Sequence, residues 1–333
     1  MKPRRALLLG WLAALGCAGP QGAPLELSIP PGAPFTAVVD SLEARGVIRY
    51  APAFALYARF RGDDHRVRSG RYRLVPGTPW IDILRALVEG RVVTVPMTVP
   101  EGFRLTQMAA RIAGVSGTTP ETVLEELQRE GTAADYGVPG PGLEGYLFPD
   151  TYRFAAGVSV RRVVGAMTRR YRAVWTPERR ARLDSLGMEE SELVTLASIV
   201  QAEARRPEEM PRIASVYHNR LRRGWPLQAD PTVLYALGGY RERLLFAAID
   251  SVADSPYNTY RRRGLPPGPI GAPGEAAIDA ALHPVEEPFL YFVARPDGTH
   301  VFTRTLAEHN RAAAAARRER AEERGDARDA GGR

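Results

Sequence analysis

The sequence is short of the side chains on which metal and redox chemistry usually depend. It contains one cysteine, Cys17, in 333 residues, so no disulfide can form within the chain and the core must hold without one. No HExxH motif, cysteine cluster or aspartate-rich calcium loop is present, and we expect neither a metal site nor a cofactor. The five histidines lack the spacing of metal ligands and are interpreted as surface or packing residues: His65, His218, His283, His300 and His309.

Two common catalytic motifs are also missing. There is no glycine loop that could cradle a phosphate and no serine in a nucleophile elbow, which leaves carboxylates as the credible catalytic groups. The formal net charge of +7 is modest for the length. It fits a polyanionic partner, an anionic membrane surface or an acidic polymer and selects none of them. A chain of this length has room for two domains and a large core.

The N-terminus lacks an apolar run long enough to span a bilayer comfortably, but it has the parts of an export signal. Arg4 and Arg5 precede an apolar run from Ala6 to Gly19, which has the length of a secretory h-region. Small residues before Cys17 make it a lipidation candidate, whereas an uncleaved anchor or an ordinary cleaved signal explains the same residues. We assign 1–24 to this segment and its linker. The body is then expected in the cell envelope, either anchored at the periplasmic face of the inner membrane or as a lipoprotein.

A strand, a Pro/Gly turn and a helix recur three times between residues 25 and 115, which predicts small α+β units packed side by side. Such units either bind a ligand or act as a scaffold that positions the next domain. The predicted strands are 25–29, 72–75 and 92–99, the helices that follow them are 35–45, 80–89 and 105–113, and an insertion after the first unit is helical over 51–61.

Residues 116–310 predict a mixed, helix-rich domain, so the fold class as a whole is α+β. The stretch LEGYLFPDTY combines aromatic rings with carboxylates, among them Glu144 and Tyr146. This combination suits stacking on and hydrogen bonding to a saccharide, and a tightly packed structural turn explains it equally well. The prolines of LPPGPIGAPG make that segment stiff enough to wall a groove. The charged tail, 311–333, is expected to fray from a helix into disorder.

The helix predicted over Ser191–Arg206 carries the best candidate for an acid catalyst. Ser191 is the expected N-cap, and Pro207 discourages continuation. Glu203 lies at the margin of the apolar stripe of this helix, where partial desolvation disfavours the charged carboxylate. A general acid that works near neutral pH needs this environment. A glutamate that simply reaches into water from a helix end explains the same position. The stripe consists of Leu193, Leu196, Ala197, Val200 and Ala204.

Five segments follow one another in a recognisable order: LEGYLFPDTY, LASIVQAEA, LQADPTVLYALG, SPYNTYRRRGLPPGPIGAPG and YFVA…HVFTRTLAEHN. Together they resemble the endolytic murein transglycosylases of the MltG (YceG-like) family, and the likeness runs from about Leu25 to Asn310. VPEGFRLTQMAARIA also resembles that family's segment between its N-terminal LysM-like part and its catalytic part. The resemblance therefore implies a LysM-like α+β region over 25–115 and a catalytic domain over 116–310.

The resemblance implies an enzyme that cuts the β-1,4 bond between N-acetylmuramic acid and N-acetylglucosamine inside peptidoglycan strands. The cut uses no water and leaves a 1,6-anhydromuramyl end. The resemblance also implies membrane attachment through the N-terminus and a role beside peptidoglycan synthases, limiting the length of new strands. The family's catalytic glutamate falls in ASIV-x-x-E, which places it at Glu203. Many relatives carry an acid where this chain has Gln201, and this departure favours Glu203 over position 201.

One carboxyl suffices for such a reaction, because the C6 hydroxyl of the sugar is the nucleophile. The same group can protonate the leaving oxygen and then take the hydroxyl proton, so the carboxylate pair of ordinary glycosidases is unnecessary. The cationic ring of the transition state still needs nearby acceptors. Candidate groove residues are Glu144, Tyr146, Gln228, Asp230, Tyr257, Asn258 and Thr259.

Three other interpretations remain open at this point. The chain could be a non-catalytic peptidoglycan-binding or scaffold protein of the wall-synthesis machinery, with Glu203 in a structural role. It could be a conventional hydrolase that uses Asp230 or Glu144 as a second carboxylate, which predicts reducing ends instead of anhydro ends. Nucleic-acid binding is disfavoured, because the export signal conflicts with it.

Overall fold

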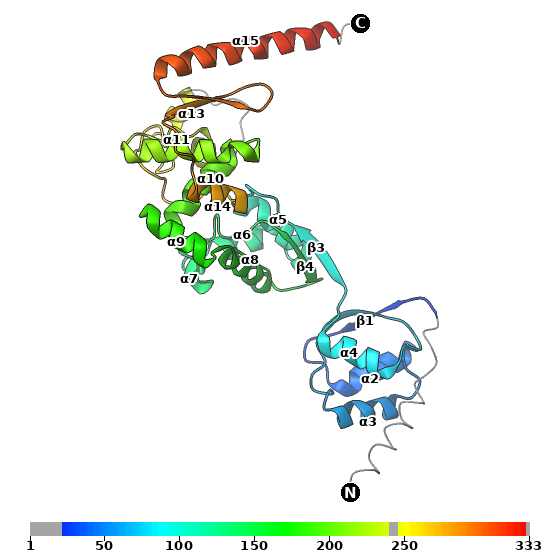
Figure 1. Cartoon of the computed structure of the whole chain (residues 1–333). Coiled ribbons are helices and arrows are strands. Elements are labelled where there is room, and N and C mark those ends of the chain that lie inside the picture. Colours follow the sequence, from blue (N-terminus) through cyan, green and yellow to red (C-terminus); the bar gives the residue numbers. More distant parts are fainter. Residues whose placement is uncertain (1–21, 240–245, 331–333) are drawn as a thin grey trace. The chain divides into compact units, whose positions relative to one another are not determined.

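The computed structural model describes residues 22–239 and 246–330 and divides the chain into two compact units (Figure 1). The first unit comprises Met1–Met97 with Val115–Gly117 and Tyr152–Val158. The second comprises Thr98–Gly114, Thr118–Thr151 and Ser159–Arg333. The N-terminal segment that predicts an export signal, including Cys17, lies outside the described residues. Where the structure describes the chain, no helix is both long and apolar enough to cross a bilayer.

The first unit is built around one antiparallel pair of strands, β1 (Leu25–Ile29) and β2 (Gly70–Leu74), in which Leu27 faces Tyr72. Helices α2 (Phe35–Ala44), α3 (Ala51–Arg61) and α4 (Trp80–Glu89) share a single apolar core with this pair. Tyr72 lies in this core, where its hydroxyl donates to the Arg68 and Leu87 carbonyls at 2.6 and 3.2 Å. The first two predicted βα units and the insertion between them therefore form one body with a common core.

The third predicted strand has a different partner. β3 (Thr94–Thr98) pairs with β4 (Thr151–Ala155) and not with β1 or β2. The first stretch of the first compact unit ends at Met97, and that unit also takes in Val115–Gly117 and most of β4 from later in the chain, so the predicted boundary at residue 115 stays a prediction. The α+β class itself is confirmed.

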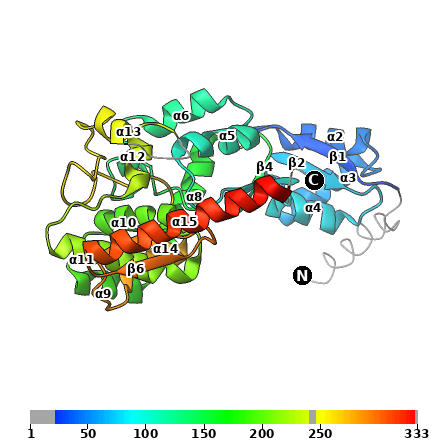
Figure 2. The same ribbon diagram turned by 90° about the horizontal axis from the view of Figure 1, so that it is seen from above.

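The second unit is helix-rich, and α10 (Glu190–Glu203), α11 (Met210–Arg222) and α14 (Glu275–Leu282) pack against one another within it (Figure 2). The other elements of its first half are α5 (Leu105–Ser116), α6 (Pro120–Gln128), α7 (Thr132–Asp135), α8 (Val160–Val174) and α9 (Pro177–Leu186). The remaining elements are η1 (Pro207–Glu209), α12 (Asp230–Ala236), α13 (Phe246–Ser251), β5 (Tyr291–Ala294), β6 (His300–Thr303) and α15 (Leu306–Ala330).

Helix α10 differs from the amphipathic helix that the sequence predicts. Every residue from Leu193 to Val200 is buried, because α10 is surrounded by other helices and has no solvent face along this stretch. The N-cap is Glu189, not Ser191. Its side chain accepts from the N3 backbone while Glu192 accepts from the Glu189 backbone, which is a capping box.

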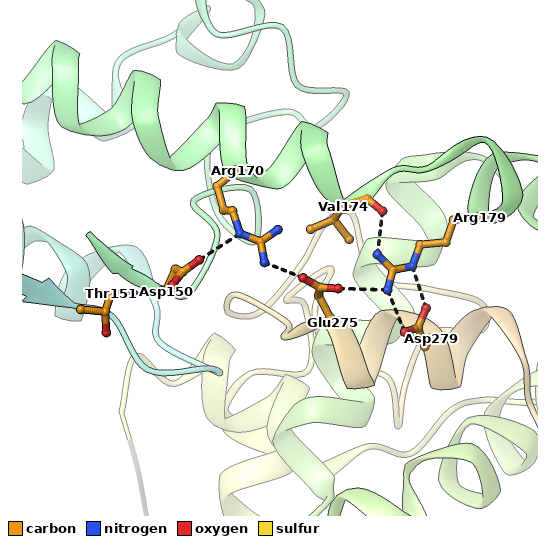
Figure 3. A network of polar contacts seen from close by, with 7 residues as sticks. All are labelled: Asp150, Thr151, Arg170, Val174, Arg179, Glu275 and Asp279. Atoms are coloured by element: carbon orange, nitrogen blue, oxygen red, sulfur yellow. Dashed lines mark hydrogen bonds and ion pairs between the residues drawn. The ribbon is translucent and has the colours of Figure 1, made fainter. Parts of the chain in front are cut away.

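A chain of ion pairs holds α14 against the two helices that precede α10 (Figure 3). Arg170 of α8 bonds both Asp150, at 2.9 Å, and Glu275 at the start of α14. Arg179 of α9 also bonds Glu275, at 3.1 Å, and grips Asp279 with two hydrogen bonds of 2.8 Å. This bidentate geometry is the strong form of the arginine–carboxylate pair. The network thereby fixes the position of α14, which packs against α10.

The part of the predicted disordered tail that the structure describes, up to Ala330, is helical. α15 continues to Ala330 and packs along the β5–β6 hairpin, as Figure 1 shows in red and orange. The Arg320 guanidinium donates to the Ala294 carbonyl of β5. The tail is rich in alanine, arginine and glutamate, which are strong helix formers, and the hairpin supplies a surface for it.

Candidate active site

A cavity of about 460 Å³ opens beside the C-terminal end of α10. Residues of α10, α11, the loop before α12, both strands of the β5–β6 hairpin and α15 line it, so segments distant in sequence meet there. This convergence of polar side chains on one concave site makes it the candidate active site. The lining side chains that can transfer protons or form hydrogen bonds include Glu203, Tyr217, Arg220, Gln228, Asp230 and His300.

Glu203 is the last residue of α10, and its side chain is half-buried in the cavity wall. The Tyr217 hydroxyl donates a hydrogen bond of 2.8 Å to its Oε1. Burial raises the pKa of Glu203 from 4.5 to about 7, and the charge of Asp230 adds to the rise. The Tyr217 hydrogen bond and the Arg220 charge oppose it. Near neutral pH this carboxyl can therefore either donate or accept a proton, as a general acid and base must.

Two residues of α11 support Glu203, and the sequence analysis did not single out either. Tyr217 and Arg220 lie one turn apart and are both buried. The Arg220 guanidinium donates to the Leu290 carbonyl at 2.7 Å and the Leu227 carbonyl at 2.6 Å. Arg220 therefore ties the start of the hairpin and the loop before α12 to the helix beside Glu203. No local sequence signal reveals this role, because it depends on how α10 and α11 pack.

Gln228 and Asp230 line the cavity as predicted candidates for the groove. Gln228 has a φ of 49°, the left-handed region that is uncommon for a residue with a side chain. Its backbone N–H donates to the Thr259 carbonyl at 3.1 Å, which holds the loop in this conformation. Asp230 is exposed at the start of α12 and accepts a hydrogen bond from the Tyr260 hydroxyl. Tyr260 also lines the cavity and was not among the predicted residues.

His300 is a second cavity residue that sequence reasoning did not select. Its side chain is only 3% exposed, and its ring meets that of Phe292 edge to face at 5.4 Å. Nδ1 lies 2.8 Å from the Glu209 carboxylate, which also accepts from the His300 backbone N–H at 2.9 Å. A carboxylate only accepts, so Nδ1 carries the proton in this contact. His300 is a packing residue, as expected, but it also lines the cavity.

Asn258, Thr259 and Tyr146 lie elsewhere, fully buried and away from the cavity lining. The Asn258 amide donates to two backbone carbonyls of the preceding segment, at 2.8 and 3.1 Å. The Thr259 hydroxyl oxygen accepts from the Ala229 backbone N–H at 3.0 Å, next to Asp230. Tyr146 packs edge to face on another tyrosine in the core. Asn258 and Thr259 therefore hold the loops around the cavity through hydrogen bonds to the backbone and do not line the cavity themselves.

Glu144 and Tyr257 form a separate cluster with Tyr235 of α12. Glu144 accepts from the Leu105 backbone N–H at 3.2 Å and from the Tyr235 hydroxyl at 3.3 Å, and the Tyr235 and Tyr257 rings lie 4.8 Å apart. Burial raises the pKa of Glu144 to about 7, against the opposing effect of these hydrogen bonds and of Arg104. Neither Glu144 nor Tyr257 is among the residues that line the Glu203 cavity.

The proline-rich segment 265–274 is buried against α10. The Ser198 hydroxyl oxygen accepts from the Ile270 N–H at 3.1 Å, and the Gln201 side-chain oxygen accepts from the Gly274 N–H at 3.0 Å. Gln201 thus has a backbone partner and does not line the cavity, unlike Glu203. Among the described residues, no group of three or more His, Cys, Asp or Glu side chains is placed to hold a metal ion.

Comparison with known proteins identifies the family of the chain. Residues 27–315 match the model of the YceG-like family. An endolytic murein transglycosylase of Bacillus subtilis is 36% identical over 86% of this chain and 83% of its own length. One from Streptococcus pneumoniae D39 is 29% identical, and the match spans 57% of that longer protein. The solved structure of a YceG-like protein of Listeria monocytogenes superposes with a TM-score of 0.60 at 32% identity and covers 87% of this chain and 99% of that one. The chain belongs to the YceG-like family.

Proposed function

We propose that this protein is an endolytic murein transglycosylase with Glu203 as its general acid and base. Its substrate is the peptidoglycan glycan strand, and the bond cut is the β-1,4 link between N-acetylmuramic acid and N-acetylglucosamine. Family membership and the names of the curated relatives support the reaction class. The observation that supports the residue is a half-buried carboxyl, with a pKa raised to about 7, in the wall of a polar cavity.

The proposed reaction needs one proton carrier and no added water. Protonated Glu203 gives its proton to the glycosidic oxygen as the bond from that oxygen to C1 breaks. The resulting carboxylate then takes the proton of the C6 hydroxyl while the C6 oxygen forms its bond to C1. The products are a strand with a free C4 hydroxyl and a strand that ends in 1,6-anhydro-N-acetylmuramic acid, and Glu203 is protonated again. A pKa near 7 suits both halves of this cycle.

The electrostatics of the cavity suit the cationic ring that forms in between. Asp230 places a carboxylate in the cavity wall, and the Tyr260 hydroxyl holds it there. A fixed negative charge near a developing positive charge lowers the barrier. We assign Asp230 this stabilising role. Glu144 is the weaker candidate for a second carboxylate, because Leu105 and Tyr235 occupy its oxygens outside the cavity lining.

Digestion of purified peptidoglycan by the full chain tests this proposal directly. Mass spectrometry of the soluble products distinguishes anhydro ends from reducing ends, which are heavier by one water. The wild-type chain should release anhydro products and Glu203→Gln should release none while still binding the polymer. Glu208→Gln is a matched control, because Glu208 is exposed and is not among the cavity-lining residues. Reducing ends would favour a hydrolase, and polymer binding without any product from the wild type would favour a scaffold.

The cellular setting is part of the same proposal. We infer that the enzyme works in the cell envelope, is held there through its N-terminal segment and shortens new strands beside peptidoglycan synthases. The apolar run from Ala6 to Gly19 and Cys17 supports this setting. Intact-mass analysis of the protein from membranes tests the attachment: an acylated Cys17 at the N-terminus indicates a lipoprotein, and an unmodified, uncut chain indicates an anchor helix.

A further inference from the structure

Three of the most exposed apolar side chains in the structure belong to the first unit, one directly before α3 and two on it. Tyr50 directly precedes α3 and is 54% exposed, whereas Leu56 and Phe60 on α3 are each 59% exposed. Leu56 and Phe60 are four residues apart and therefore share one face of the helix. Figure 1 shows α3 at one edge of the first unit, beside α2.

The fold of the unit does not require these three side chains. The opposite face of α3 carries Phe54 and Tyr57, which lie in the apolar core and pack on the ring of Trp80 at 5.7 and 6.1 Å. The exposed face is thus additional apolar surface on a helix that is already anchored. Clustered apolar residues of this kind usually mark a surface that meets another apolar phase or partner.

Arginines dominate the segment that carries this face, although the Glu43 carboxylate accepts from the Ala51 backbone N–H at the start of α3. Between Glu43 and Asp63 the sequence contains no acidic residue and four arginines: Arg45, Arg49, Arg59 and Arg61. Asp63 pairs with Arg61 and Arg66. Arg49 and Arg59 are exposed, and neither has an ion-pair partner among the described residues. An apolar face with a tyrosine, a phenylalanine and unpaired arginines is the composition of helices that lie in the interface of an anionic bilayer.

The position of the unit in the chain points to the same partner. The apolar N-terminal run ends at Gly19 and β1 begins at Leu25. The few residues between them span at most about 20 Å when fully extended. If the N-terminal run enters a membrane, the first unit cannot leave the membrane surface by more than this linker allows, so even a weak surface contact is favoured by its high local concentration.

From these observations we propose that the exposed side of α3, which carries Leu56, Arg59 and Phe60, docks on an anionic phospholipid surface together with Arg49 and Tyr50 just before the helix. Leu56 and Phe60 enter the boundary between headgroups and acyl chains, and the tyrosine lies at headgroup level. Arg49 and Arg59 pair with lipid phosphates. The docked face orients the first unit on the membrane. This proposal does not depend on glycan cleavage, and a Glu203→Gln chain should dock equally well.

Site-directed fluorescence on the full chain tests the proposal. Because Cys17 is the only cysteine, a Cys17→Ser background leaves one thiol when Leu56→Cys or Phe60→Cys is introduced and labelled with an environment-sensitive dye. Arg85→Cys on α4, an exposed site outside this face, is the matched control. Vesicles of phosphatidylcholine with one quarter phosphatidylglycerol should shift the emission of dyes at 56 and 60 to the blue and bring them within reach of lipid-borne quenchers. The dye at 85 should not respond.

A charge-reversal variant tests whether the arginines bind the lipid or the dye merely lies near the vesicle. Arg49→Glu with Arg59→Glu changes two exposed residues and should leave the fold intact, as circular dichroism can verify. It should raise the lipid concentration for half-maximal response of the dye at 56 by at least about tenfold. The proposal is overturned if, in chains that float with the vesicles, dyes at 56 and 60 remain as water-exposed as the dye at 85. An equal response to pure phosphatidylcholine, or a response to purified glycan strands and not to vesicles, would also overturn it.

Discussion

Replacing Glu203 by glutamine should make the protein more stable at alkaline pH while abolishing its proposed activity. In the folded chain the pKa of Glu203 is about 7, whereas its ordinary value is 4.5. A carboxyl with a raised folded pKa favours folding below its unfolded pKa, and this contribution is lost as the pH rises through the folded value. Above about pH 8 the wild-type chain therefore holds a charge in a site that disfavours it, whereas the neutral amide of the variant brings no such charge.

The size of this effect follows from the two pKa values. The difference between about 7 and 4.5, at about 1.36 kcal/mol per unit of pKa, corresponds to about 3 kcal/mol. This figure is an upper value, because the half-buried carboxyl keeps some contact with water. The gain in the free energy of unfolding of Glu203→Gln should be close to zero at pH 4.5, grow between pH 4.5 and 7, and level off above pH 8.

Urea unfolding at pH 4.5, 6 and 8 measures this dependence, with tryptophan fluorescence as the signal. Trp175 and Trp225 both lie in the second unit, which contains Glu203. Glu208→Gln, at an exposed position, should show no such growth with pH. A stability gain that is absent at pH 8, or equal at all three pH values, would show that Glu203 is not held in an environment that disfavours its charge. The proposed acid would then lose its main physical support.

Three further outcomes are expected. Tyr217→Phe removes the hydrogen bond that lowers the pKa of Glu203, so the alkaline limb of the activity profile should move up by about one pH unit; an unmoved limb would count against the contact. Arg179→Ala should cost about 1–3 kcal/mol of unfolding free energy in urea titrations, and Arg179→Lys should recover only part, because lysine cannot grip Asp279 with two bonds. Gly145→Ala should lower the melting temperature measurably, since φ is +83° there and an added Cβ would come within 2.4 Å of a proline; an unchanged melting temperature would argue against this packing.

The elements of this fold follow from local sequence patterns more closely than its contacts do. Strand Leu25–Ile29 and helix Trp80–Glu89 lie where alternation and helical spacing predict them, because each buries one face against a neighbour. The predicted cap of α10 is wrong, because Ser191 has the preferred N-cap side chain but Glu189 takes the position through its reciprocal bonds with Glu192. The pairing of β3 with β4 joins segments far apart in the chain, and no local pattern reports it.

In the candidate site, too, some residues can be predicted from local sequence and others depend on long-range packing. Glu203 is predictable because it lies in the ASIV-x-x-E motif, and the structure places it in the cavity wall at the end of α10. Tyr217, Arg220 and His300 are not, because their roles arise only where α10, α11 and the hairpin meet. The segment around Asn258 is a groove candidate because it is polar and lies in one of the five family motifs. Its amide instead satisfies backbone carbonyls, which a list of residue types cannot distinguish from a ligand contact.

The contribution of α15 to the cavity has a consequence for biogenesis. Leu306, His309 and Arg320 complete a wall that faces Glu203, yet ribosomes make them long after Glu203 itself. A chain that is still being synthesised therefore carries Glu203 in an unfinished pocket. The order of synthesis alone would then keep the proposed activity off until almost the whole length of the chain had been made.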